Sequence, residues 1–216
     1  MTEHTSREFA GELRALRNRL AEMGSRAARQ LDLAMVSVAE YSSNLAHEVV
    51  IKDDQLDQDE RAIDELSLQI LATRQPVALD LRLVATALKM VIDLERIGDL
   101  ATGIAKRVIE LDRLPRAEVR HDLVGLGMLV QKNFAAALDA FGHGDLEQAR
   151  QVIAMDREIN LLSNSTFAML VAHVATIPAT ITSVLPLTSV CRYLERIGDH
   201  VQNFAEDVIH LGPPPA

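Results

Sequence analysis

The chain has no tryptophan, a single cysteine and very few aromatic residues. Aromatic residues make up 3% of its 216 positions, while Leu, Ala, Val, Ile and the other apolar residues bring the apolar share to 48%. Strands favour aromatic and β-branched residues in alternation, so this mixture suits packed helices better. The lone Cys191 cannot form an internal disulfide, which fits a reducing compartment, and its expected role is that of a small buried residue. The composition predicts an ordered all-α protein.

The chain also lacks long runs of Lys or Arg, and its first residues do not resemble a secretory leader. Its formal net charge is −9, which argues against a nucleic-acid partner, because such binding depends on neutralising phosphates. The first residues, Met1–Thr5, contain neither a basic segment nor an apolar one, so no signal peptide is expected. We expect the protein to be cytoplasmic.

No Asp, Glu, Lys or Arg occurs from Ile159 to Cys191. This stretch resembles a membrane span, but Asn, Ser and Thr interrupt it, as do Pro178 and Pro186. A spanning helix needs ~20 predominantly apolar residues. We therefore expect no membrane span here but two buried helices around a turn near Thr176–Pro178, with a partner-binding face as the alternative.

One hexapeptide, Leu-Glu-Arg-Ile-Gly-Asp, occurs twice, at residues 94–99 and 194–199. In each copy Glu and Asp are four residues apart, so on a helix their carboxylates lie on one face, one turn from each other. Two acids in this arrangement repel each other unless a cation lies over them. The motif therefore predicts a metal site in each half of the chain, formed in part by Glu95 and Asp99 and by Glu195 and Asp199.

Apolar spacings of three and four residues, with caps and prolines between them, predict six helices. We expect these helices over residues 6–41, 45–74, 76–111, 116–141, 146–174 and 178–211. Pro76 is expected as the first residue of the third helix. Val49-Val50 and Asp53 recur as Val152-Ile153 and Asp156. We therefore predict a tandem repeat of two three-helix bundles, residues 1–114 and 115–216.

The second and third helices of the first half are expected to be antiparallel, so residues equally far from their turn lie at the same height. Counting from Pro76 places Asp53 level with Asp99, and Asp57 level with Glu95. Helix axes ~8–10 Å apart then bring the four carboxylates around one small volume.

The same counting around Ile177 places Asp156 level with Asp199, and Asn160 level with Glu195. These ligand sets contain only oxygen donors, with no nearby His or Cys. They favour hard ions such as magnesium, manganese, iron or calcium.

Other ways of relieving the repulsion remain open. Like charges ~4 Å apart cost about 4 kcal/mol per pair at an effective dielectric constant near 20. The acids could protonate, or pair with arginines. Arg96 and Arg196 directly follow their Glu and are expected to point about 100° away around the helix. Arg61 and Arg82 could still reach the acids, so an ion-paired structural site is an alternative.

The duplicated hexapeptide, the repeated Glu/Asp-x-x-x-Asp motif and the two three-helix halves resemble the PhoU family of bacterial phosphate-signalling proteins. The run Gln-Pro-Val-Ala-Leu-Asp-Leu-Arg at 75–82 is similar to that family's entry into its third helix. Residues 196–200, followed by Asn203, resemble the end of its second repeat.

The resemblance implies a non-enzymatic cytoplasmic regulator that represses phosphate uptake and the phosphate-starvation response when phosphate is plentiful. It implies contacts with the ATPase subunit of the phosphate ABC transporter and with a membrane-bound sensor histidine kinase. Such contacts would recruit the protein to the inner face of the membrane, and a homodimer is expected.

The resemblance also implies bound metal ions, with magnesium, manganese, iron and zinc all represented in the family. Carried over to this sequence, the metal-binding residues are Asp53, Asp57, Glu95, Asp99, Asp156, Glu195 and Asp199. Asn160 stands where the second repeat should have an acid, so we expect the second site to bind more weakly. The alternatives are a carboxylate-bridged metal enzyme and a purely structural helical scaffold.

Overall fold

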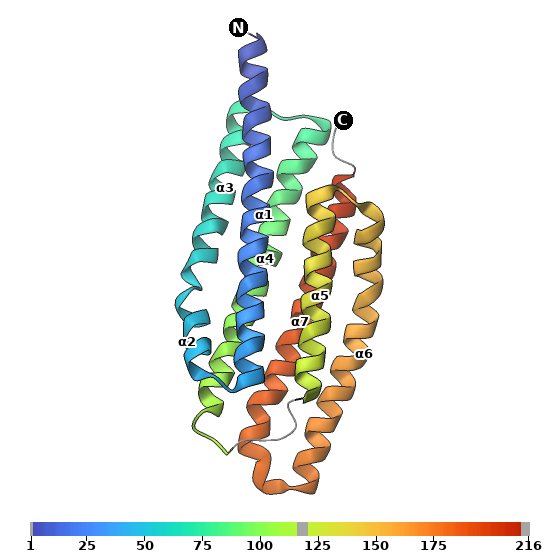
Figure 1. The fold of residues 1–216 in the computed structure, drawn as a ribbon. Coiled ribbons are helices and arrows are strands. Elements are labelled where there is room, and N and C mark those ends of the chain that lie inside the picture. The colour runs from blue at the N-terminus through green and yellow to red at the C-terminus, as the bar shows by residue number, and fades with distance from the viewer. Residues whose placement is uncertain (1, 116–120, 213–216) are drawn as a thin grey trace.

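The computed structural model describes residues 2–115 and 121–212, and every regular element within them is helical (Figure 1). Its helices are α1 (Thr2–Glu40), α2 (Ser43–Ile51), α3 (Asp54–Arg74), α4 (Ala78–Leu111), α5 (His121–His143), α6 (Leu146–Thr176) and α7 (Ile181–Leu211), with a short 3₁₀ turn η1 (Pro178–Thr180) before α7. These are the six predicted helical segments, with α2 and α3 together forming the second. The all-α prediction is confirmed, while the expected helix start at 116 lies outside the described residues.

Helix α1 buries the stripe that its sequence spacing predicts. Leu16, Leu20, Met23, Ala27 and Leu31 recur at intervals of three and four and are all fully buried. The α1 segment contains no proline, and it is rich in Ala, Leu, Arg and Glu, which favour helix. Propensity and burial therefore agree over the whole element.

The helix expected over 45–74 is interrupted at Lys52 and Asp53. The Lys52 backbone N–H donates to the carbonyls of Glu48 and Val49, and α3 then begins at Asp54. The interruption follows the run Val49-Val50-Ile51. Three consecutive β-branched residues lower helix propensity because their side chains crowd the preceding turn.

The connection between α3 and α4 differs from the prediction at Pro76. Gln75 adopts a left-handed conformation (φ 48°, ψ 57°) and ends α3, and Val77 is extended. Helix α4 therefore begins at Ala78, and Pro76 is not its first residue. The centre of the turn lies slightly later in the chain than expected, which matters for the register of the acids.

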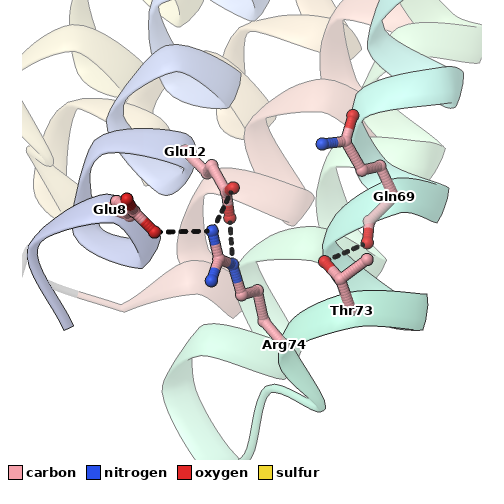
Figure 2. A network of polar contacts seen from close by, with 5 residues as sticks. All are labelled: Glu8, Glu12, Gln69, Thr73 and Arg74. Atoms are coloured by element: carbon pink, nitrogen blue, oxygen red, sulfur yellow. Dashed lines mark hydrogen bonds and ion pairs between the residues drawn. The ribbon is translucent and has the colours of Figure 1, made fainter. Parts of the chain in front are cut away.

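An ion-pair network fastens the end of α3 to the first part of α1 (Figure 2). The Arg74 guanidinium donates from Nε and Nη2 to the two carboxylate oxygens of Glu12, at 2.9 and 2.7 Å. Its Nη2 also lies 3.5 Å from a Glu8 oxygen. Because this fork uses both carboxylate oxygens, it fixes the orientation of α3 against α1.

Helices α4 and α7 form the most extensive helix–helix interface of the described chain. They are antiparallel and lie at the centre of the molecule, with α1, α2 and α3 on one side and α5 and α6 on the other (Figure 1). Buried residues from both halves form a single hydrophobic core. The sequence boundary expected between 114 and 115 lies in the connection from α4 to α5.

The second half has a side-chain cap at the start of α6 and the predicted turn after that helix. Asp145 Oδ1 accepts hydrogen bonds from the backbone N–H groups of Glu147 and Gln148 and so caps α6. The turn between α6 and α7 falls at Ile177–Thr180, as expected near Pro178. None of the described helices has the length and apolar character needed to cross a membrane.

The expectation that the charge-free helices around this turn are buried is wrong for their outer faces. Met169, Val171, Ile181 and Leu185 are all exposed, Leu185 to 64%. The α6–α7 turn extends past the end of α5 at which that helix begins, at His121 (Figure 1). In the first half, by contrast, the long α1 reaches the corresponding α3–α4 turn and pairs with it through Arg74.

Candidate metal sites on the two central helices

The two hexapeptides lie within α4 and α7, as predicted. In both copies the Ile and Gly are buried, the Glu is half-buried, and the Arg and Asp are exposed. The acidic face of each motif therefore lies at the edge of the core, where a helix from the same half packs beside it.

Contacts at the first hexapeptide fix the register between α3 and α4. A Cβ at Gly98 would lie 2.2 Å from Leu56 Cδ1, so the glycine leaves the space that Leu56 fills. Asp53 Oδ1 accepts hydrogen bonds from Thr102 Oγ1 at 2.9 Å and from Gln30 Nε2 at 3.2 Å. Asp53 thus contacts the residue almost one turn beyond Asp99, because the hairpin is centred near Val77 and not on Pro76.

The shifted register brings Glu60 of α3 close to Glu95. Burial raises the pKa of Glu95 to about 7, with further contributions from the negative charges of Asp99 and Glu60. The pKa of Glu60 is also raised, by burial and by the nearby Asp64 and Asp57. The sequence reasoning missed Glu60, although it lies three residues after Asp57 and therefore on the same helix face.

In the second half, Asp156 lies with both acids of the hexapeptide. Its pKa is raised by burial and by the charges of Asp199 and Glu195, and that of Asp199 is raised by burial and by Glu195. Asp156 Oδ1 is buried without a hydrogen-bond partner, while Asn160 Nδ2 donates to Asp156 Oδ2 at 2.7 Å. The three acids expected at this site are thus neighbours, and one oxygen of Asp156 lacks a donor.

Arginines reach the acids in a way that the sequence reasoning did not expect. Arg96 Nε lies 3.4 Å from Glu95 and its Nη1 lies 3.2 Å from Asp99. The expectation that Arg96 points away is therefore wrong, because its long side chain bends back over its own helix. In the second half Arg192 takes this role, at 2.9 Å from Glu195. Arg82, an alternative ion-pair partner for the acids in the sequence prediction, instead donates to the His210 carbonyl at 3.5 Å.

Both clusters offer oxygen donors that suit a hard cation. Among the side chains that the structure describes, no three His, Cys, Asp or Glu residues are already grouped so that they could hold a metal ion. The fit rests on the crowding of partly buried carboxylates, since burial is the main cause of the raised pKa values of Glu95, Asp156 and Asp199 and neighbouring acids add to it, and on the unpartnered oxygen of Asp156. The surrounding arginines pair with the acids from the exposed side, where such pairs stabilise little.

A hydrogen bond links the two halves beside these clusters. His200 Nδ1 lies 2.8 Å from Asp93 Oδ1, and both side chains are largely buried between α7 and α4. His200 directly follows Asp199, and Asp93 precedes Glu95 by two residues. The two acidic motifs therefore stand on helices that are joined directly to each other.

The fold and the two motifs define a class of duplicated helical-bundle proteins that carry one acidic cluster in each half. The sequence model of the PhoU domain matches residues 20–108 and 123–208. The chain belongs to the PhoU family, and is a phosphate-transport accessory protein of regulatory type, not an enzyme.

Relatives agree with this assignment over nearly the whole chain. The phosphate-specific transport system accessory protein PhoU homolog of Pseudomonas aeruginosa is 42% identical, over 98% of this chain and 88% of that protein. The crystal structure of PhoU from Pseudomonas aeruginosa has a TM-score of 0.88 at 41% identity, covering 94% of this chain and 98% of that one. The phosphate transport system regulatory protein PhoU from Streptococcus pneumoniae has a TM-score of 0.85 at 25% identity, covering 94% and 96%.

Proposed function

We propose that this protein is a metal-binding regulator that represses phosphate uptake and the phosphate-starvation response when phosphate is plentiful. In this proposal it is a cytoplasmic homodimer, recruited to the inner face of the membrane by the ATPase subunit of the phosphate ABC transporter and by a sensor histidine kinase. The names of its relatives, which refer to phosphate-specific transport, support the regulatory role. The acidic clusters on α4 and α7 support the binding of metal.

The residues proposed to hold the first ion are Asp57, Glu95 and Asp99, joined by Glu60. Asp53 precedes Asp57 by four residues, and its Oδ1 is held by Gln30 and Thr102. Those for the second ion are Asp156, Glu195 and Asp199. A bound cation supplies the positive charge that the clustered carboxylates lack, and so ties α3 to α4 and α6 to α7.

The two sites are proposed to be unequal, with the first binding more tightly. In the second repeat Asn160 occupies the position equivalent to Asp57, and Ser163 the position equivalent to Glu60. The second site therefore lacks two of the acids of the first. Ser163 Oγ donates a hydrogen bond to Glu195 at 3.5 Å. In the first half the equivalent neighbour of Glu95 is the acidic Glu60. Fewer carboxylates lower the affinity of an oxygen-ligand site for a divalent cation.

Thermal unfolding with and without Mn²⁺ tests this ranking. Asp57→Asn copies the asparagine of the second site and is expected to lose more of the Mn²⁺-dependent rise in melting temperature than Asp199→Asn. Asp54→Asn, which removes an exposed acid from the start of α3, is the matched control and should keep the full rise. Equal losses in the two site variants would contradict the ranking, and a wild-type protein without any rise would contradict metal binding.

Affinity capture tests the partners. Tagged protein from phosphate-replete cells is expected to retain the transporter ATPase and the sensor kinase, identified by mass spectrometry. A variant that combines Asp57→Asn and Asp199→Asn should retain less of both if metal shapes the contact surface. Recovery of neither partner with the wild-type protein would refute the adaptor role.

A further inference from the structure

A cavity of about 160 Å³ lies between α1 and the junction of α2 with α3, on the outer side of the first half. Its lining combines basic, amide and apolar side chains. The lining residues are Arg26, Arg29, Gln30, Leu33, Val49, Lys52, Gln55 and Leu56. Three cations from two different segments therefore face one small space in a protein whose net charge is −9.

The second half contains the same cavity with different chemistry. Its volume is about 220 Å³, and its lining residues are Leu129, Lys132, Asn133, Ala136, Gln148, Gln151, Val152 and Met155. Six of these eight positions are the repeat equivalents of lining residues in the first cavity, displaced by 103 residues. The internal repeat thus supplies a matched comparison within one chain.

The two cavities differ in charge at two of the equivalent positions. Arg29 and Gln30 correspond to Lys132 and Asn133, which are similar in chemistry, whereas Arg26 corresponds to Leu129 and Lys52 to Met155. The first cavity therefore has three basic residues and the second has one. Lys52 lies at the interruption between α2 and α3, and α6 runs through the equivalent position as a continuous helix.

The acids near the first cavity leave much of this positive charge available. Arg26 pairs with Asp59 through Nε at 3.0 Å, which leaves its two Nη groups to donate elsewhere. Lys52 pairs with Glu48 one turn before it, and both side chains are half exposed, so the pair is weak and easily exchanged. Arg29 has no acidic partner among the described residues. Neither Asp59 nor Glu48 lines the cavity.

We propose that this cavity binds a small phosphate-type oxyanion, and that its counterpart in the second half does not. Arginine and lysine side chains from facing segments, together with the Gln55 amide, can donate to several oxygens of one anion at once. The volume is well below the ~300–1,000 Å³ of pockets that enclose drug-sized ligands, so the site fits a single phosphate group. The cavity adjoins the first metal cluster, because its lining residue Gln30 also donates to Asp53. None of the residues proposed to hold the metal lines the cavity itself.

Calorimetric titration of the intact protein with inorganic phosphate tests the site directly. The titration is done at constant ionic strength and in EDTA, so that no bound cation can attract the anion. Binding of one phosphate per chain is expected, weakened at least tenfold by Arg29→Gln. The repeat-equivalent change Lys132→Gln is the control and should leave the affinity unchanged. Both positions are exposed, so circular dichroism should show the same fold in both variants.

A transplant gives the converse test. Leu129→Arg combined with Met155→Lys places the missing cations in the second cavity and is expected to raise the stoichiometry from one phosphate to two. Vesicles containing phosphatidylglycerol form a separate arm, because a lipid headgroup carries the same phosphate chemistry. Vesicle binding that Arg29→Gln abolishes, without binding of free phosphate, would assign the anion to a lipid. Binding of neither probe, or equal weakening by Arg29→Gln and Lys132→Gln, would overturn the proposal.

Discussion

The raised pKa of Glu95 predicts that replacing this acid by glutamine makes the metal-free protein more stable at pH 8. Glutamine keeps the shape of the side chain and removes the charge. The Glu95 side chain is only 16% exposed and lies beside Asp99 and Glu60, so its ionised form is poorly solvated in the folded protein. In the unfolded chain the same carboxylate is surrounded by water.

The sign of the pH dependence follows from where the proton is bound. Between pH 4.5 and about 7 the folded protein holds a proton on Glu95 that the unfolded chain has released. The free energy of unfolding therefore falls as the pH rises through this window. A shift of this size corresponds to about 3 kcal/mol as an upper limit. Because Arg96 and residual solvent screen the charge, we expect Glu95→Gln to gain about 1–2 kcal/mol at pH 8 and almost nothing at pH 4.5.

Urea unfolding in EDTA at several pH values between 4.5 and 8 measures this difference. The helical circular dichroism signal is the appropriate probe, because the chain has no tryptophan. Glu65→Gln removes the same charge from an exposed position on α3 and should change stability by the same small amount at every pH. A gain for Glu95→Gln that does not depend on pH, or that Glu65→Gln reproduces, would refute the explanation by burial and neighbouring charge.

Three further predictions concern stability and can be measured by chemical or thermal unfolding. Leu187→Ala in the core should lower the free energy of unfolding by about 2–5 kcal/mol. Leu185→Ala, at an exposed position, should change it by no more than about 0.5 kcal/mol. Similar losses for the two variants would show that the wrong face of α7 has been assigned to the core. Asp145→Ala should cost about 1 kcal/mol through loss of the α6 cap, and Asp145→Asn should restore most of it. Arg74→Met should lower the melting temperature near pH 7. That loss should shrink in acid as Glu12, whose pKa the arginine lowers, becomes protonated; a loss that is constant with pH would contradict the ion pair.

Helix positions could be predicted from the sequence because the apolar periodicity and the capping and turn residues indicate the same helix boundaries. The buried stripe of α1, the cap at Asp145 and the turn near Pro178 all follow from local rules. The interruption at Lys52 was missed because apolar spacing continues across it. The β-branched run Val49-Val50-Ile51 was the signal that could have revealed it.

The acids of the candidate sites were harder to place than the helices. Counting from Pro76 put Asp53 beside Asp99, but the left-handed Gln75 and extended Val77 move the centre of the hairpin. A shift of two residues turns a side chain by about 200° around a helix, so small errors in a turn exchange one facing residue for another. Glu60 therefore lies near Glu95, at the level where counting from Pro76 predicts Asp57. In the second half Asp156 lies near Asp199 as expected. Ser163, and not the expected Asn160, contacts Glu195, so the register there is shifted in the same way.

The central pairing of α4 with α7 means that the repeat in the sequence is not a unit of folding. A fragment that ends at residue 115 would expose the face of α4 that α7 covers, and would leave Asp93 without His200. Such a fragment should aggregate or pair with a second copy through that face.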